Sequence, residues 1–232
     1  LVTGVSEFAA RLVGPACAIA MVAGTAALAR QFWPRRPRLG ALSALILAGF
    51  TVFLIYAIAT MFDALLGLAV LAGVASLWRI GQGASALRDW AWFGVALAFG
   101  VYAKGPVILV HLLPLLLTIR LWAPAPPTFK DAAKGFGFAF ALALGLVAFW
   151  LIPALITASP EYRTELLWTQ SAARVAGGMA HDRPIWFLAA LLPVNLFPWG
   201  WSWRLWRAIA ATWRADAGIR LCGIWAISGL IL

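Results

Sequence analysis

Charged side chains are scarce in this sequence. Only 11% of the 232 residues are Asp, Glu, Lys or Arg, and the mean hydropathy is +0.92. Soluble domains average roughly a quarter charged residues and less than half apolar residues, so this composition excludes an ordinary soluble domain. The apolar fraction of 64% instead predicts an all-α, polytopic transmembrane helix bundle.

Cysteine and histidine are also scarce, with two of each. Cys17 and Cys222 lie in different apolar runs, far from each other in the sequence and from either histidine. Isolated cysteines of this kind are typical of small packing residues, not of a disulfide or a metal pair.

Long apolar runs predict seven to eight spans in a single domain, residues 1–232, since a span needs about 20 apolar residues. The sequence opens on Leu1 and stops inside an apolar run that begins near Leu221, so we expect a fragment of a longer protein. The seven complete candidate spans are Leu12 to Ala29, Gly40 to Ala57, Thr60 to Trp78, Trp90 to Ala103, Val107 to Thr118, Gly135 to Ala158, and Ile185 to Trp201.

The charges divide unevenly between the two sides of the predicted membrane. Alternating spans place 13 of the 18 basic residues and three of the eight acids on one side, which the positive-inside rule makes cytoplasmic. These basic residues are spread over four short loops beside tryptophans. That pattern favours contact with membrane lipid headgroups and speaks against a nucleic-acid partner.

Lys104 is the only formal charge between Trp90 and Leu117, and the alternation of spans places it on the extracytoplasmic side. The 13 residues before it span only about 20 Å as a helix, against a hydrocarbon core of about 30 Å. We therefore expect the lysine below the headgroups, in a protein-lined or watery recess. Gly105-Pro106 is expected to end one helix and begin the next, in a place where protein or water satisfies the backbone.

Asp63 begins the third predicted span, directly after a short outer turn. An acid in this position is either a helix N-terminal group favoured by the helix dipole or an intramembrane ionisable group with a function. The sequence leaves both interpretations open.

The largest outer connection, residues 159–184, predicts an extracytoplasmic loop with one amphipathic helix lying along the membrane surface. Ser159-Pro160-Glu161 is typical of a helix start, because it offers a capping hydroxyl, a proline at the first helical position and an acid in the first turn. Gly177-Gly178 is typical of a helix end. Within the helix, Gln170 and Arg174 are four residues apart on one face.

Four polar residues thus share the outer side: Asp63, Lys104, Arg174 and His181. Cations suit phosphate oxygens, and a carboxylate or imidazole suits proton transfer or metal binding. Taken singly, Arg174 pairs equally well with lipid phosphate, and His181 is equally a solvated loop residue. Taken together, the four favour a site for an anionic substrate. His111 has no evident partner and is interpreted as a helix-packing residue.

Four segments occur in order along the chain: VSEFAARLVGPACAIA, IATMFDALLGLAV, FGVYAKGPVILVHLLPLLL and LLWTQSAARVAGGMAHDRPIWFLAALLPVNLFPW. They resemble segments of the aminoarabinose transferase and dolichyl-phosphate-mannose protein mannosyltransferase superfamily, membrane glycosyltransferases with a GT-C-type fold. The resemblance implies inverting transfer of a sugar from a polyprenyl-phosphate donor to a lipid or protein acceptor. It implies a multi-pass protein of the bacterial cytoplasmic (inner) membrane with an extracytoplasmic active face.

The resemblance also implies roles for individual residues. Some members bind a divalent metal ion near the histidine, which makes His181 a candidate metal ligand, although a single imidazole is far from a complete site. The residues implied as catalytic are Asp63, Lys104 and His181, and those implied as substrate-binding are Gly105, Pro106, Trp168, Gln170 and Arg174.

The general base of the superfamily belongs to an Asp-Glu pair in an outer loop that precedes the segment with Glu7, and no residue here matches it. We therefore expect the isolated chain to be inactive. A transporter without chemistry is the main alternative, but the polar groups cluster at one interface and no inverted repeat is visible. A structural assembly subunit gives no reason for Lys104-Gly105-Pro106.

Overall fold

A computed structural model describes residues 7–57, 63–83, 86–164 and 186–231. These ranges are helical and contain no strand, apart from an isolated bridge between Gln82 and Ala125, which confirms the predicted all-α class. The helices are α1 (Glu7–Phe32), α2 (Arg38–Ala48), α3 (Thr51–Ala57), α4 (Asp63–Ile80), α5 (Leu87–Lys104), α6 (Val107–Leu117), α7 (Ile119–Trp122), α8 (Phe129–Thr157), α9 (Pro160–Thr164), α11 (Trp186–Asn195), the 3-10 helix η2 (Trp199–Trp201), α12 (Trp203–Thr212) and α13 (Ala217–Ile231).

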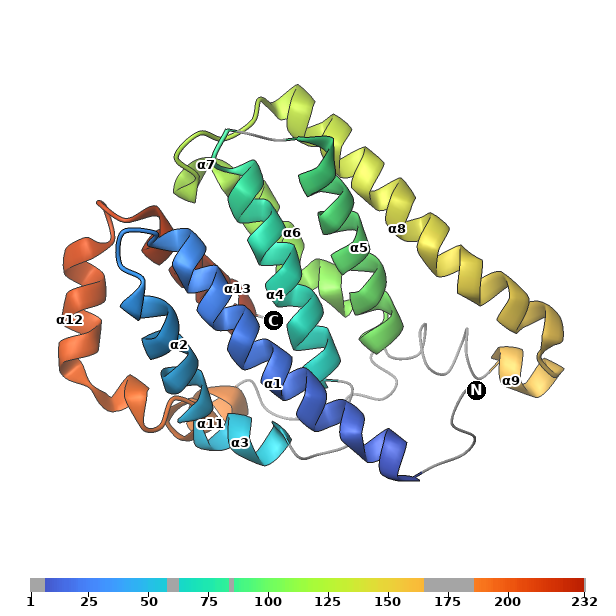
Figure 1. The fold of residues 1–232 in the computed structure, drawn as a ribbon, viewed down its shortest axis with the longest axis horizontal. Coiled ribbons are helices and arrows are strands. Elements are labelled where there is room, and N and C mark those ends of the chain that lie inside the picture. Colours follow the sequence, from blue (N-terminus) through green and yellow to red (C-terminus); the bar gives the residue numbers. More distant parts are fainter. Residues whose placement is uncertain (1–6, 58–62, 84–85, 165–185, 232) are drawn as a thin grey trace.

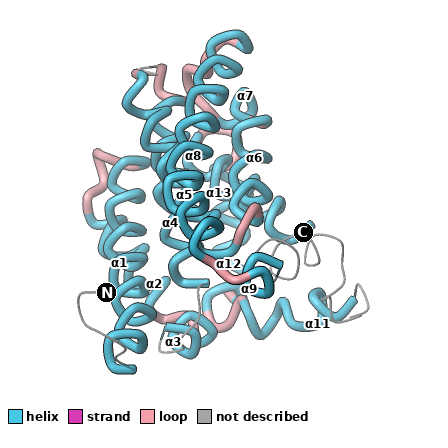
Figure 2. The backbone as a smooth tube through the Cα atoms, turned by 90° about the vertical axis from the view of Figure 1, so that its right-hand side faces the viewer, coloured by secondary structure: helices cyan, strands magenta, loops and turns pink. Residues whose placement is uncertain are grey.

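Helices α1, α4, α5 and α8 form a row in which each helix packs on the next (Figure 1). Helices α1 and α4 run in one direction and α5 and α8 in the other, so within this row only α4 and α5 are antiparallel neighbours. Helix α6 packs on α4 and α5, and α13 packs on α6. In both views α3, α9 and α11 lie near the same end of the bundle, which we call the outer end, and the start of α8 marks the inner end (Figure 2).

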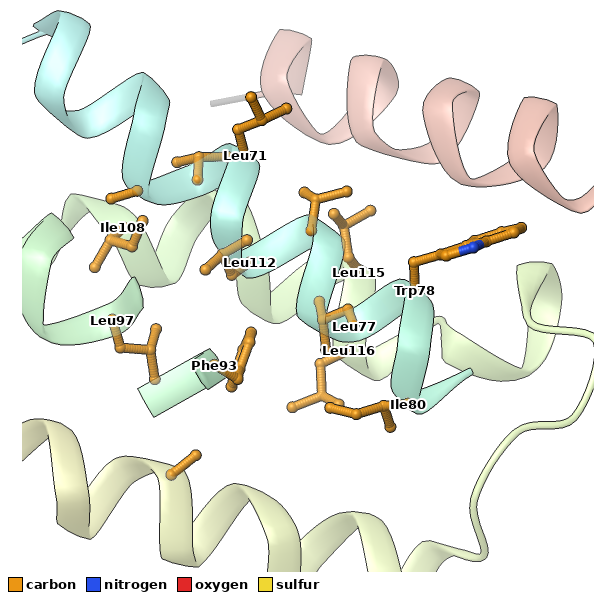
Figure 3. Packing of buried hydrophobic residues seen from close by; sticks show 14 of the residues in the cluster. Leu71, Leu77, Trp78, Ile80, Phe93, Leu97, Ile108, Leu112, Leu115 and Leu116 are labelled. Atoms are coloured by element: carbon orange, nitrogen blue, oxygen red, sulfur yellow. The ribbon is translucent and has the colours of Figure 1, made fainter. Parts of the chain in front are cut away.

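The core forms around α4, whose leucines meet apolar residues of α5 and α6 (Figure 3). Small residues allow the helices to approach closely, as is common in membrane bundles. A Cβ atom at Gly73 would lie 2.4 Å from Leu112 of α6, and one at Gly94 would lie 2.5 Å from the carbonyl oxygen of Ala139 in α8. These contacts hold α4, α5, α6 and α8 together.

Three of the described helices are long and apolar enough to cross a membrane: Arg11–Phe32 within α1, α4 and α8. Helices α2 and α3 make a fourth only if they are counted as one span, because they are bent by 74°. The predicted span from Gly40 to Ala57 is therefore broken at Gly49-Phe50, and the predicted count of seven to eight spans is not confirmed.

The helix before Lys104 is longer than predicted, but it is not among the described helices that are long and apolar enough to cross a membrane. Helix α5 has 18 residues, which is about 27 Å against a hydrocarbon core of about 30 Å. It is longer than predicted because Leu87, Arg88 and Asp89 extend it at the inner end. The predicted span from Ile185 to Trp201 is also not one helix, since α11 ends at Asn195 and η2 starts after Pro198.

Candidate active site at the outer end

Asp63 and Lys104 meet at the outer end of the bundle. Asp63 is the first residue of α4 and Lys104 the last residue of α5, and these ends are adjacent because the two helices pack in opposite directions. The Lys104 ammonium donates a hydrogen bond to Oδ1 of Asp63 within an ion pair. The structure thus brings together two of the residues that the sequence placed on one side.

Both side chains of this pair remain accessible, Lys104 at 39% and Asp63 at 47%. The described residues therefore leave both charged groups partly accessible, and the predicted recess, protein-lined or watery, stays a prediction. Each charge suits the helix end that carries it, an acid at an N-terminus and a base at a C-terminus. An exposed ion pair contributes at most about 1 kcal/mol to stability, so both groups are available to a ligand at little cost to the fold.

Gly105 and Pro106 separate α5 from α6, as the sequence predicts. Gly105 has φ +67° and ψ −151°, a combination essentially limited to glycine. Its N–H donates to the carbonyl of Val101 at 2.8 Å, which closes the last turn of α5. Apart from its own chain neighbours, no described residue has an atom within 4 Å of the place where a Cβ would be. The described part of the chain thus leaves this backbone open to an approaching molecule.

An apolar groove of about 590 Å³ lies between the outer halves of α5 and α8. Tyr102 forms one wall: its hydroxyl donates to the Leu146 carbonyl, and its ring packs edge-on against Trp150 at 6.0 Å. The groove lies on the α8 side of α5, whereas Lys104 meets α4. Sequence analysis missed this groove. The remaining lining residues are Phe149, Pro153, Ala154 and Thr157.

The outer loop begins as predicted, with α9 starting at Pro160. Hydrogen bonds from its own backbone N–H and from the Ser159 side chain hold the pKa of Glu161 below its ordinary value, so this acid is ionised at neutral pH. Arg163 donates to the carbonyls of Ala158 at 3.1 Å and Ile156 at 3.3 Å, and thereby caps the end of α8.

Four predicted site residues, Trp168, Gln170, Arg174 and His181, lie outside the described residues, so their roles stay predictions. Within the ranges that the structure describes, no three His, Cys, Asp or Glu side chains gather as a metal site. The candidate metal ligand, His181, is not among those residues, and the metal also stays a prediction.

A second ion pair joins the inner ends of α4 and α5. Arg79 Nε donates to Asp89 Oδ1 at 2.7 Å, and Arg79 Nη2 donates to Ser76 Oγ at 3.2 Å. In contrast to the outer pair, the acid is buried, with 5% of the Asp89 side chain exposed. Both residues lie between the candidate spans that end at Trp78 and begin at Trp90, and the sequence does not predict that they pair.

The apolar helices of membrane-spanning length indicate an integral membrane protein of the helical class. An accessible lysine–aspartate pair lies at one end of its bundle. The chain belongs to the dolichyl-phosphate-mannose-protein mannosyltransferase family, which matches residues 1–153. The match contains the first three of the four sequence segments and confirms the predicted family.

Curated relatives are named as undecaprenyl phosphate-alpha-4-amino-4-deoxy-L-arabinose arabinosyl transferases. The protein from Pseudomonas fluorescens is 28% identical over 208 residues, covering 84% of this chain and 35% of its own length. That from Pseudomonas aeruginosa is 29% identical, with 86% and 36% covered, and that from Erwinia tasmaniensis is 26% identical, with 74% and 31% covered. The chain thus spans about a third of the length of these relatives. No solved structure matches it.

Proposed function

We propose that this chain is the part of a membrane glycosyltransferase that holds the phosphate of a polyprenyl-phosphate sugar donor. The observation that carries the proposal is the accessible Asp63–Lys104 pair at the outer end, next to the open backbone of Gly105. Family membership and the names of the relatives support a sugar carried on a polyprenyl phosphate.

In the proposed reaction, a hydroxyl of a lipid or protein acceptor attacks the anomeric carbon of the donor. The bond from that carbon to the phosphate oxygen breaks on the opposite face, so the configuration inverts, and the acceptor proton passes to a general base that no residue of this chain matches. Polyprenyl phosphate leaves with the bonding electrons. The Lys104 ammonium stabilises the charge that develops on this leaving group, and Asp63 holds the ammonium in position.

The other predicted contacts complete the proposal. Arg174 is suited to bidentate contact with the donor phosphate, with Gly105, Pro106, Trp168 and Gln170 beside it. The groove at Tyr102 offers an apolar surface for a hydrocarbon chain at the same end of the bundle. If the reaction uses a divalent metal ion, His181 would be one of its ligands.

The proposal places the reaction on the extracytoplasmic face of the bacterial inner membrane, because the cationic loops lie at the opposite end of the bundle. The N-termini of α2, α5 and α8 and the C-termini of α1 and α4 all meet at that basic end. Seven to eight spans follow if α5, α6, α11, α13 and the bent pair α2–α3 are embedded together with α1, α4 and α8.

The test uses the full-length protein in proteoliposomes, supplied with an undecaprenyl-phosphate-linked aminosugar and a lipid acceptor. We expect free undecaprenyl phosphate and glycosylated acceptor to form in equal amounts. A transporter would instead move the intact donor between leaflets and release no undecaprenyl phosphate. That outcome would contradict the proposed transferase and support the transporter alternative.

A further inference from the structure

A second apolar pocket, of about 260 Å³, lies at the inner end of the bundle, where the chain passes from α6 through α7 into α8. One charged side chain, Arg120, stands among otherwise apolar lining residues. The others are Leu113, Leu116, Leu117, Ile119, Pro127, Phe129, Ala132, Ala133 and Phe136.

The walls of this pocket are fixed by local hydrogen bonds. Thr118 Oγ1 donates to the Pro114 carbonyl at 2.6 Å where α6 ends, and the buried Trp122 donates from Nε1 to the Leu115 carbonyl at 2.9 Å. On the other side, Thr128 caps α8 by accepting from the Asp131 N–H at 3.2 Å. These hydrogen bonds fix the backbone on both sides of the pocket.

The rim of the pocket is apolar and faces outward, with Leu117 exposed at 80% and Phe129 at 83%. In a membrane protein such exposed side chains meet lipid, and the pocket between them opens to the same lipid. At about 260 Å³ it lies just below the roughly 300 Å³ at which sites for whole small molecules begin. It therefore has room for a segment of one hydrocarbon chain.

Arg120 supplies a free cation at this pocket. Its side chain is exposed and makes no hydrogen bond or ion pair with the described part of the chain. The acid of the first turn of α8, Asp131, does not line this pocket, and its Oδ2 accepts from Thr128 Oγ1 at 2.6 Å. An arginine next to an apolar pocket has the chemistry to bind a phosphate whose hydrocarbon chain enters that pocket.

We propose that this pocket binds an anionic phospholipid of the cytoplasmic leaflet, with one acyl chain between α6 and α8 and the headgroup phosphate on Arg120. The charge of this end supports that occupant, since 13 of the 18 basic residues and only three acids belong to the predicted cytoplasmic side. The site lies at the opposite end of the bundle from Lys104 and is independent of the proposed transferase activity.

The experiment compares two lipids with the same acyl chains, phosphatidylglycerol and phosphatidylcholine, by native mass spectrometry of the purified full-length protein. We expect phosphatidylglycerol to bind more tightly and Arg120→Gln to weaken its binding about fivefold, the effect of about 1 kcal/mol per basic residue at an anionic surface. Ala133→Phe, at an exposed position of the lining, should fill the pocket and remove bound lipid without disturbing the core.

Arg88→Gln is the matched control, because Arg88 is also an exposed arginine of the inner end but does not line the pocket. Retained lipid preference in this variant supports a defined site. Three results would overturn the proposal: equal binding of both lipids by the unaltered protein, equal losses in Arg88→Gln and Arg120→Gln, or selective binding of undecaprenyl phosphate in place of phosphatidylglycerol.

Discussion

At the scale of single residues, the proposed phosphate site requires that Lys104 and Asp63 are placed for a ligand and not for stability. Their accessibility limits the stabilisation that the pair provides to about 1 kcal/mol. Asp63 is the first residue of α4 and Lys104 is the last residue of α5, and the two helices pack on each other. Helices α4 and α5 thus present one cation and one carboxylate together at the outer end of the bundle.

Gly105→Ala tests the helix break next to Lys104. Because φ at Gly105 is +67°, a side chain would strain the backbone by about 1–3 kcal/mol, although the surrounding space is open. The measurement is the free energy of unfolding in detergent. Gly137→Ala in α8 is the control, since it also meets no neighbouring atom and alanine in a helix interior is stabilising by about 0.5–1 kcal/mol. Equal effects of the two changes would contradict the account.

At the scale of elements, α4 and α5 are joined by an ion pair at each end, and burial separates their roles. The inner pair, Arg79–Asp89, is largely withdrawn from solvent, with 34% of the arginine and 5% of the aspartate side chain exposed. Removing one partner of a buried pair leaves an uncompensated charge, whereas removing both often costs little. The outer pair, Asp63–Lys104, is exposed, so removing one partner leaves no buried charge.

Arg79→Leu should therefore lower the free energy of unfolding by about 3 kcal/mol, the low end of the range for breaking a buried pair, because Arg79 is partly exposed. The double variant Arg79→Leu/Asp89→Leu should recover most of the loss. Asp63→Asn, which breaks the exposed outer pair, should change stability by less than about 1 kcal/mol. Chemical denaturation of the purified protein measures all three, and a double variant no more stable than the single one would refute the buried-charge explanation.

Sequence patterns predicted the helices well where long apolar runs decide the structure, as in α1, α4 and α8. They failed where tertiary contacts decide it. The candidate span that begins at Trp90 leaves Asp89 outside it, yet Arg79 pairs with Asp89 and α5 begins before it. The bend after Gly49 was missed because the apolar run continues unbroken through it.

The candidate site was partly predictable for a related reason. Alternation of spans was enough to place Asp63 and Lys104 on one side, and the antiparallel packing of α4 on α5 then brings them into contact. The two apolar pockets could not be predicted, because each depends on which faces of α5, α6 and α8 meet.

At the scale of the whole molecule, the sequence predicts a basic inner side and an outer side with as many basic as acidic residues. Topology can be tested by labelling introduced cysteines in intact cells with a membrane-impermeant maleimide, in a protein without Cys17 and Cys222. We expect Arg163→Cys in α9 to be labelled from outside and Arg36→Cys, between α1 and α2, only after the cells are opened. The reverse labelling pattern would place the Asp63–Lys104 pair on the cytoplasmic side.

The central claim, that Lys104 binds the phosphate of a lipid-linked sugar donor, is tested most directly by the turnover of Lys104→Ala in the full-length protein. The account predicts that kcat falls on the order of 10²–10³-fold, as when a donor to a developing oxyanion is removed, while membrane insertion is unchanged. Lys104→Arg should retain more activity than Lys104→Ala, and Lys134→Ala at the inner end should retain full activity. Unchanged turnover of Lys104→Ala would contradict the claim.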